Sequence, residues 1–578
     1  MSLGENVMDY QATAQGPLTI YVLQDQTPKG LKDLKDILKA AGQEDVHPRD
    51  RNIFWFQQAE EFLQKSGMNY ELVTQYQRPK GTDDMTVPQI MQDYAASRHI
   101  HWVAMPHKVV VDHVNCDNDG LKGATSGLDY GVDFNSPAFK KDFAGSQEYS
   151  RRMALALADR IEAGYEKTGT IVGVNIQNRY NWLVPKYLNE EMKKRGKRDI
   201  YVTTYFSHID QTDKLDVASK PPQMQEVVAS ILGTDAATFH TNEYALNLAN
   251  LAKRLYPHQV KIDPKRMAIT HTLEGEPRTV KIGSHFLGID VERWQRLVTE
   301  DKAWEYAKDF LKQADGRKIL FAYDRCDPIK AADDRVEIFG KFLKGNPDIA
   351  KDVVLFQNFY LANTTERDYE SVYSRLQKRI TKLVADVNHE NKGELAHPPI
   401  VTLDKMSEMQ IAGMIIASTI SGGTHVVSSV SEGLHMGMLE SYVANAKLSE
   451  NGSALLKQLA QKHDVPLNKN SGALSFWTSK IAGVVHYVQG TFPMHPKQKD
   501  FSVRTLRQAL QSTPVERAFR MAKSITFIRN NTSAEWIKSM ERQMNQLRLE
   551  KLRAPASVQP HRGRDRSKQT PASVYAQV

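Results

Sequence analysis

The sequence predicts an α/β protein made of two doubly wound domains with mainly parallel sheets. Short apolar runs such as TIVGVNI and KILFAYD alternate with longer segments, such as RRMALALADRIEAGYEKTG, whose apolar residues recur at three- and four-residue spacing. This alternation is typical of repeated β-α-β units. A single sheet would need about nine strands, which is large for one twisted sheet, so two domains are favoured.

The expected strands, in chain order, are LTIYVLQ, IHWVAMP, TIVGVNI, DIYVTTYF, KILFAYD, DVVLFQNF, PIVTLD, THVVSSV and IAGVVHYV. We place the break between the domains within residues 275–294. The last long helical pattern has no strand after it, so we expect it to pack back on the body of the protein. The predicted organisation is a first domain at 1–280, a second domain at 281–515, a C-terminal helix at 516–550 and a disordered basic tail at 551–578.

Composition indicates an ordinary globular protein and argues against a nucleic-acid-binding surface. The chain has 578 residues, of which 41% are hydrophobic and 25% charged, with a formal net charge of +8. Residues 551–578 hold six lysines and arginines against one acid, Asp565. Because this charge sits on a Pro-, Ser- and Gln-rich tail, the folded body is close to neutral and is not expected to bind nucleic acid.

The two cysteines, Cys116 and Cys326, are too few for a disulfide framework and too far apart in sequence to indicate a metal site. Cys326 is expected to be a small buried side chain, because no base is placed to activate it. The N-terminus lacks a signal-peptide pattern, and no apolar stretch is long enough to span a membrane. We expect a soluble, cytoplasmic protein; export without a signal, as an effector, stays open.

The stretch LFAYDRCDPIKAADDR carries two cations where a strand ends. Asp324, Arg325, Asp327 and Lys330 follow the apolar run ILFAY. Ligands of open parallel sheets bind outside the carboxyl ends of the strands. Arg325 and Lys330 are therefore candidates to bind a diphosphate, the first through its fork of donors and the second as a point charge. The alternative is that the two cations pair with the neighbouring aspartates on a hydrated loop.

The stretch SSVSEGLHMGMLESYVAN places two acids around the start of a helix. Glu432 and Gly433 lie in the expected turn, and Glu440 lies about two helical turns beyond Glu432. Two carboxylates facing one cleft are suited to bind sugar or ribose hydroxyls, and the backbone N–H groups of residues 433–436 would favour an anion. The alternative is a helix start whose acids only compensate the helix dipole.

Taken in order, these segments resemble the trehalose-6-phosphate synthases and their relatives, which are retaining glycosyltransferases of the two-domain GT-B fold. The order is DRxDxxK, FLKGNP, VVLFQ, ERDYESVYSRL, PIVTLD and EGLHMGMLESYVAN, preceded by SPAF, LVPKYLNEEMKKRG, YFSHID and FHTNEYALNL. The resemblance extends over about residues 17–550 and is strongest at 320–445. It implies two Rossmann-like domains facing a central cleft.

On the donor side, the resemblance implies that Arg325 and Lys330 hold the diphosphate of a nucleotide sugar and stabilise the charge that develops as it leaves. Arg367 matches the arginine on the nucleotide side of the family. In this family the acceptor attacks from the face that the diphosphate leaves, and the leaving phosphate takes the acceptor proton. No cofactor and no metal are therefore expected.

The resemblance also implies contacts to the sugar and the ribose. Glu440 matches the glutamate that binds the ribose hydroxyls, and His208 matches a histidine that reaches the transferred sugar from the first domain. Glu432 stands where the family has an aspartate that contacts that sugar. The family's Asp-Gly-Met-Asn is here Glu432, Gly433, Leu434 and His435, followed by Met436 at the helix start. The longer acid and the altered fourth residue leave the donor sugar open.

The acceptor side departs from the family most. The His-Asp-Tyr-His segment of the family is replaced by QNRYNW at 177–182, and the first strand is followed by residues 24–25, Gln and Asp, in place of an arginine. We infer that the acceptor is not glucose 6-phosphate. Three basic side chains there either bind another anionic acceptor or form a hydrated surface. The acceptor-side candidates are Gly30, Lys140, Lys141, Arg179 and Tyr180.

The leading hypothesis is a retaining glycosyltransferase that uses a nucleotide-diphosphate sugar, with UDP-glucose favoured, and an acceptor other than glucose 6-phosphate. Another sugar phosphate, a small molecule and a protein all stay open as acceptors, and the oligomeric state is not indicated. Alternatives are a pseudo-glycosyltransferase and an inactive GT-B scaffold that acts by binding partners. Retention of Arg325, Lys330 and both acids argues against full loss of activity.

Overall fold

The protein is described by a computed structural model, which covers residues 19–23, 69–77, 99–128, 130–208, 221–360, 372–392, 397–479 and 488–553, with residues 92, 96, 219 and 395 between them. The expected strand at 481–488, except for its last residue, and the tail beyond Arg553 lie outside the described residues. Within these segments, no helix combines the length and the apolar composition that a membrane crossing requires.

The first part of the chain forms a nine-stranded sheet in the order β3-β2-β1-β4-β5-β6-β9-β8-β7. Along this order, neighbouring strands from β3 through β1 and β6 to β9 pair in parallel. At the far end, β8 pairs antiparallel with both β9 and β7. The strands are β1 Thr19–Leu23, β2 Asn69–Gln77, β3 Ile100–Met105, β4 Val172–Gln177, β5 Tyr201–Phe206, β6 Ala236–Phe239, β7 Val260–Asp263, β8 Ala268–His271 and β9 Arg278–Ser284.

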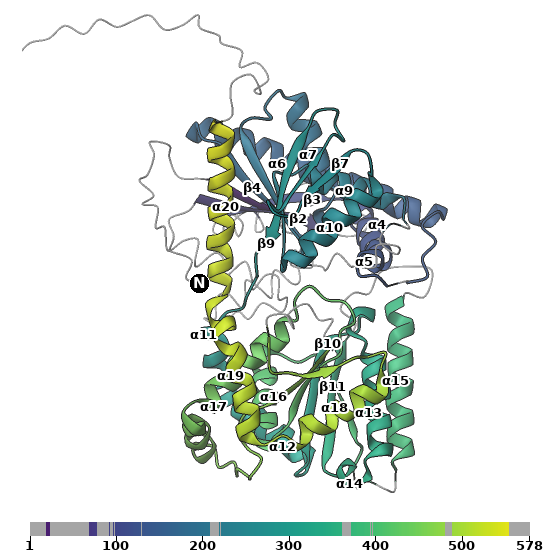
Figure 1. The fold of residues 1–578 in the computed structure, drawn as a ribbon, viewed down its shortest axis with the longest axis vertical. Helices are drawn as coiled ribbons and strands as arrows, with labels where there is room; N and C mark the ends of the chain where they lie inside the picture. The colour runs from purple at the N-terminus through teal and green to yellow at the C-terminus, as the bar shows by residue number, and fades with distance from the viewer. Residues whose placement is uncertain are drawn as a thin grey trace, which may run out of the picture.

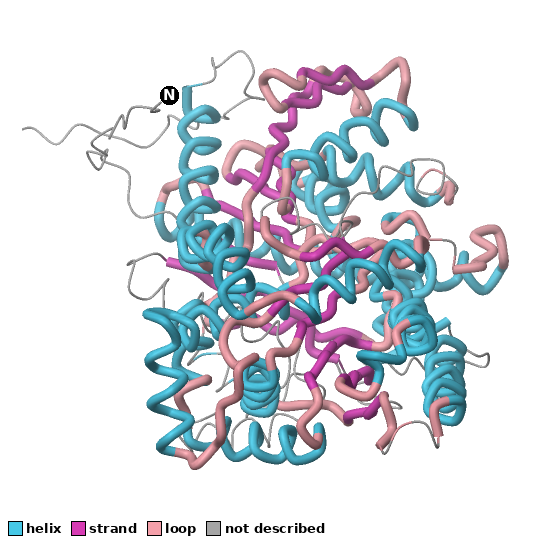
Figure 2. The backbone as a smooth tube through the Cα atoms, turned by 60° about the horizontal axis from the view of Figure 1, so that its bottom comes forward, coloured by secondary structure: helices cyan, strands magenta, loops and turns pink. Residues whose placement is uncertain are grey.

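Helices cover both faces of this sheet (Figure 1, Figure 2). They are α4 His107–Asn115, the π-helix Cys116–Leu121, α5 Lys122–Thr125, α6 Pro137–Thr168, α7 Val184–Lys194, α9 Gln223–Leu232 and α10 Asn242–Leu255. The longest, α6, has clear local signals at both ends. The Ser136 hydroxyl accepts the Phe139 N–H at 3.2 Å, and Gly169 ends the helix with φ 65°, a conformation that glycine adopts without strain.

The second part of the chain forms a six-stranded, fully parallel sheet in the order β12-β11-β10-β13-β14-β15. The strand order reverses between β10 and β13, which makes this the point where a doubly wound sheet binds its ligands. The strands are β10 Lys318–Arg325, β11 Val353–Tyr360, β12 Ile400–Leu403, β13 Thr424–Val427, β14 Ser475–Ser479 and β15 Phe492–Met494.

The helices of the second domain also lie on both sides of its sheet (Figure 1). They are α11 Val291–Leu297, α12 Asp301–Ala314, α13 Ala332–Gly345, α14 Pro347–Ala350, α15 Val372–Glu390, α16 Glu408–Ser421, α17 Met436–Lys462 and α18 Lys499–Gln511. Helix α16 is nearly all apolar and is buried from Ile411 to Ser421. Such a helix is stable only between packed layers, here the sheet and α12.

The chain then returns from the second domain to the first. Helix α19, Pro514–Asn530, packs on α17, and α20, Ser533–Arg553, runs along the first domain to β5 (Figure 1). Near its end the Lys551 ammonium donates to the Arg198 carbonyl at 2.8 Å. The sequence predicts one helix at 516–550 and a disordered tail from residue 551. The structure has two helices, separated at residues 531–532, and the second continues to Arg553, so the predicted start of the tail is wrong by three residues.

The predicted boundary at residues 280 and 281 falls inside strand β9 and is corrected by the structure. Strand β9 pairs with β6, so the first sheet continues to Ser284. Strand β2 was not predicted, although Leu72 and Val73 on it are buried, because its sequence NYELVTQYQ mixes polar and apolar residues without a clear period.

Candidate functional site

The turn after β10 carries both predicted diphosphate-binding cations. Arg325 is the last residue of β10, and the Asp327 carboxylate accepts the Ile329 N–H at 3.2 Å to start a single 3₁₀ turn, Pro328–Lys330. This turn lies at the carboxyl end of β10, beside β13, at the reversal of strand order. The Arg325 side chain is 40% exposed, so its guanidinium is accessible.

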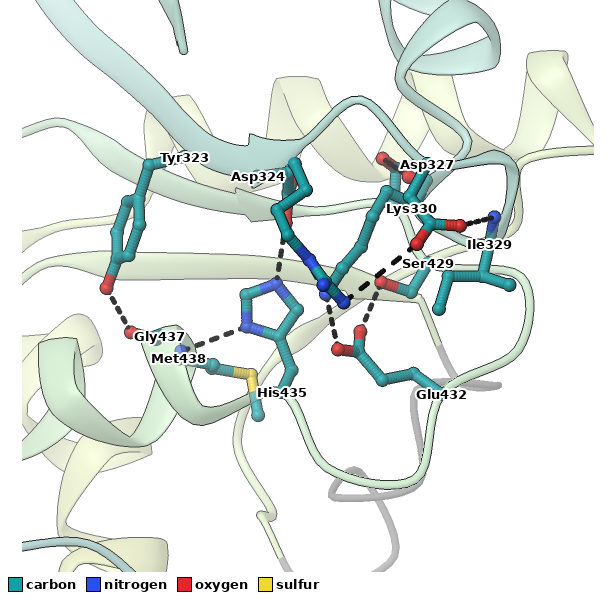
Figure 3. Close-up of polar contacts among 12 residues, drawn as sticks. Tyr323, Asp324, Asp327, Ile329, Lys330, Ser429, Glu432, His435, Gly437 and Met438 are labelled. Atoms are coloured by element: carbon teal, nitrogen blue, oxygen red, sulfur yellow. Dashed lines mark hydrogen bonds and ion pairs between the residues drawn. The ribbon is translucent and has the colours of Figure 1, made fainter. Parts of the chain in front are cut away.

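Lys330 joins the two segments that the sequence singled out (Figure 3). Its ammonium donates to one Glu432 oxygen and lies 3.6 Å from an Asp324 oxygen. The other Glu432 oxygen accepts the Ser429 hydroxyl at 2.6 Å. The predicted alternative of pairing with aspartates is thus partly right for Lys330, but the Lys330 side chain is only 10% exposed and not on a hydrated loop.

Asp324 is the centre of a buried charge network below this turn. Its carboxylate accepts hydrogen bonds from Arg335 at 2.8 Å and from the His435 Nε2 at 3.1 Å. Burial by itself would raise the pKa of Asp324, but the charges of Lys330 and Arg335 and the histidine hydrogen bond lower it well below its ordinary value. Asp324 is therefore ionised and fixes the start of α17 against the end of β10.

Helix α17 begins where the sequence places it, at Met436, with Glu432 outside the helix in the preceding turn. His435 is its N-cap, and the His435 Nδ1 accepts the Met438 N–H at 3.1 Å (Figure 3). One turn into the helix, Glu440 is 3% exposed, and the Tyr323 hydroxyl lies 3.4 Å from its carboxylate. The same hydroxyl donates to the Gly437 carbonyl at 2.6 Å.

The first domain contacts this turn directly. The Tyr244 hydroxyl donates to the Glu432 carbonyl at 3.0 Å. A Cβ atom on Gly433 would lie 1.7 Å from the His208 carbonyl oxygen, so only glycine fits here. The His208 backbone therefore borders the Glu432 turn, and the contact of its imidazole with a transferred sugar stays a prediction. Burial and the charge of Arg179 lower the pKa of His208 to about 4, so its imidazole is neutral at pH 7.

The acceptor-side candidates are distributed differently from the sequence prediction. Arg179 is buried rather than exposed on a hydrated surface, and its charge is paired. Its Nε donates to Asp117, and one Nη donates to Asn118 at 2.8 Å. The Tyr180 hydroxyl donates to the same Asn118 oxygen at 3.1 Å. Their shared partners lie about sixty residues upstream, which hides the network from sequence analysis.

Lys140 and Lys141 lie in the first turn of α6 rather than on a loop. Lys140 is exposed, and the Lys141 ammonium lies 3.5 Å from Asp112. Gly30 and Arg367 lie outside the described residues. Cys326 is buried, and burial raises the pKa of its thiol to about 12, which fits an unreactive side chain.

Sequence analysis missed one cation near the turn after β10. Lys122 at the start of α5 in the first domain donates to Asp327 in the second, and both side chains are 3% exposed. No motif marks this lysine, because its partner is 205 residues away. Among the residues that the structure describes, no group of three or more His, Cys, Asp and Glu side chains is arranged to hold a metal ion.

Comparison with known proteins identifies the family of the chain. The model of glycosyltransferase family 20 matches residues 130–546, most of the chain. The chain belongs to this family. It is thus a glycosyltransferase with two Rossmann-like domains of the GT-B type, as the resemblance implies.

Among curated relatives, the UDP-forming α,α-trehalose-phosphate synthase of Candida albicans is 24% identical over 362 residues, which cover 63% of this chain and 67% of that protein. The synthase 1 of Arabidopsis thaliana is 24% identical over 340 residues. That match covers 57% of this chain but only 32% of the Arabidopsis protein.

Solved structures share the fold over nearly the whole chain. The N-terminal domain of a Candida albicans trehalose-6-phosphate phosphatase aligns with a TM-score of 0.70 at 14% identity, covering 93% of this chain and 98% of that one. A UDP-forming trehalose-phosphate synthase of Burkholderia vietnamiensis aligns with a TM-score of 0.67 at 16% identity, with the same coverage.

Proposed function

We propose that this protein transfers a sugar, with retention of configuration, from a UDP-sugar to an acceptor other than glucose 6-phosphate. The observation that carries the proposal is the meeting of the Arg325–Lys330 turn with the Glu432–Glu440 segment at the strand-order reversal of the second sheet. The UDP donor, with UDP-glucose favoured, is supported by the names of the curated relatives, which are UDP-forming synthases.

In this proposal, Arg325 and Lys330 bind the donor diphosphate. The bond between the sugar C1 and the diphosphate oxygen breaks, the acceptor oxygen bonds C1 from the same face, and its proton passes to the leaving diphosphate. The two cations stabilise the negative charge that grows on the diphosphate during this step. Glu440, held beside Tyr323 near the start of α17, binds the ribose hydroxyls.

In this proposal, donor binding changes the contacts of Glu432. Its carboxylate is held by Lys330 and Ser429, and its carbonyl by Tyr244 of the first domain. When a diphosphate takes up the charge of Lys330, the Glu432 oxygen on that side is released toward the sugar. We propose that this exchange orients the sugar beneath His208 for transfer.

The acceptor is proposed to differ from glucose 6-phosphate because the first domain offers a different set of groups. The Arg179 guanidinium is engaged by Asp117 and Asn118, and the Tyr180 hydroxyl by Asn118. Lys140 and Lys141 on α6 supply positive charge to an anionic acceptor. Another sugar phosphate, a small molecule and a protein side chain are the classes to be tested.

The decisive experiment measures nucleotide diphosphate release from UDP-, GDP- and ADP-sugars, with and without glucose 6-phosphate, in the wild type and in Arg325→Ala. We expect the wild type to release UDP from a UDP-sugar and Arg325→Ala to release it at least about 100-fold more slowly. Glucose 6-phosphate should not stimulate the release. Release within twofold of wild type in the variant would refute the diphosphate assignment. Stimulation by glucose 6-phosphate would refute the acceptor assignment.

An inactive scaffold is the second candidate, because Lys330 and Glu432 are already paired to one another and fold alone does not set activity. One structure with this fold is named as a domain of a phosphatase. UDP binding by calorimetry without release from any donor, across acceptors of all three classes, would favour this candidate.

A further inference from the structure

Lys122 is a buried cation of the first domain that lies against the diphosphate-binding turn of the second. It begins α5, is 2% exposed, and its ammonium donates to the Asp327 carboxylate. The Tyr373 hydroxyl of α15 lies 3.4 Å from the same ammonium and donates to the Asn118 carbonyl at 3.1 Å. One cluster therefore joins the π-helix and α5 of the first domain to the turn after β10 and to α15 of the second.

Asp327 connects this cluster to the cations that would bind the diphosphate. The same carboxylate that pairs with Lys122 lies 3.9 Å from the Arg325 guanidinium and caps the turn that ends at Lys330. An anion at this position competes with a diphosphate for Arg325. Pairing with Lys122 offsets the charge of Asp327 and weakens that competition.

The pair is hard to explain as a stabilising contact alone. Taking an ammonium and a carboxylate out of water costs several kcal/mol per ion, and their attraction often only offsets this cost. A buried ion pair 205 residues apart in sequence, adjacent to a site that binds charged substrate, points to a role in that site.

We propose that Lys122 is a positioning residue for the donor: by neutralising Asp327 across the domain boundary, it keeps Arg325 available to the diphosphate. This inference rests on the proposed function. Lys122 does not itself contact the donor in this scheme. It makes the donor site depend on the first domain being in contact with the second.

The proposal has a pH signature that a purely structural contact would not give. Burial, opposed by Asp327, lowers the pKa of Lys122 to about 8. The charged and titratable groups that face it are Asp327, Arg325, Arg179, Asp117 and Tyr373. Above pH 8 Lys122 loses its proton, Asp327 is no longer neutralised, and donor kcat/KM falls.

The test compares Lys122→Met, Asp327→Asn and the double variant with the wild type. It measures kcat and KM for UDP release from UDP-glucose, the favoured donor, from pH 6.5 to 9.5. We expect Lys122→Met to lower donor kcat/KM by about tenfold or more, mainly through KM, and Asp327→Asn to restore it in the double variant to within about threefold. The fall above pH 8 should be absent from the double variant.

Lys281→Met is the matched control, because Lys281 forms an ion pair with Glu550 at 2.5 Å that is exposed and far in sequence from the turn. Its kinetics should match the wild type. If Lys122→Met does not fold, the double variant, which buries neither charge, and the wild-type pH profile still decide the question.

Three results would overturn the inference. They are donor kcat/KM of Lys122→Met within twofold of wild type, no rescue by Asp327→Asn, and a fall above pH 8 that persists in the double variant. If the wild type itself neither turns over nor binds a UDP-sugar, the proposed function fails together with the inference. If the wild type is active and Lys122→Met has the same donor kcat/KM, the inference fails and the proposed function stands.

Discussion

At the scale of single residues, the sequence identified some members of the proposed donor site and missed others. Arg325, Lys330 and Glu432 were recognisable because each lies within a few residues of the end of an apolar run. Lys122 and Arg179 were missed or misplaced because their burial depends on carboxylates at Asp327 and Asp117, far away in sequence. A local pattern shows which residues end a strand, but not which distant charge lies against them.

Glu440 allows a test of the nucleotide site at the residue scale. We expect Glu440→Gln to weaken UDP binding, measured by calorimetry, by about 1–3 kcal/mol, because a charged acceptor for the ribose hydroxyls is lost with little change in shape. Tyr323→Phe is the companion variant, since it removes the 3.4 Å contact to Glu440 and the hydrogen bond to the Gly437 carbonyl but keeps the carboxylate. An unchanged dissociation constant in Glu440→Gln would exclude the ribose role.

At the scale of elements, the sequence predicted strands with clear apolar runs, such as β4, β5 and β10, and missed strands of mixed or very short sequence, such as β2 and β6. Strand β10 contains the continuous apolar run ILFAY, as expected for a strand that is buried on both faces of a sheet. The antiparallel strands β7 and β8 are short, mix polar with apolar residues and lie at the edge, where a strand needs no continuous apolar run. Strand β9, RTVKIGS, also mixes polar with apolar residues, and the predicted domain boundary falls inside it although β9 pairs with both β6 and β8.

The turn between β13 and α17 is fitted to the first domain at Gly433. We expect Gly433→Ala to lower stability by about 1–3 kcal/mol and to impair donor turnover, because its Cβ would meet the His208 carbonyl oxygen. Thermal unfolding and donor kinetics measure both effects. Gly345→Ala is the control, because no atom lies within 4 Å of a Cβ at that position. Equal melting temperatures and kinetics of Gly433→Ala and wild type would contradict this close approach.

At the scale of the whole molecule, the two domains and the returning helix α20 are joined through buried polar groups as well as apolar ones. Tyr244 holds the Glu432 turn, Tyr373 and Lys122 hold the two domains at the β10 turn, and Lys551 holds α20 to the first sheet. Buried polar groups are satisfied only in one relative position of their partners. Contact between the domains and the arrangement of the proposed donor site are therefore coupled.

Buried histidines give the molecule a predictable response to acid. Burial is the main cause that lowers the pKa of His113 to about 3 and those of the half-buried His208 and His285 to about 4, and in each case the charge of an arginine lowers the pKa further. In the unfolded chain these groups titrate near 6.5. Between pH 6.5 and about 4 the unfolded state therefore binds more protons, so stability is fully present above pH 6.5 and falls as the pH is lowered.

Each such histidine should contribute about 1.4 kcal/mol of lost stability per pH unit in this window. We expect the melting temperature to fall steadily from pH 6.5 to 4.5 in calorimetry. His113→Gln should reduce the number of protons taken up on unfolding in this window by about one, which makes the fall with pH less steep. Glutamine still reaches Ser146, the partner of the His113 ring at 3.0 Å, but does not titrate. A slope in His113→Gln equal to that of wild type would mean that His113 is protonated in the folded protein, and that its burial beside Tyr149 does not keep it neutral.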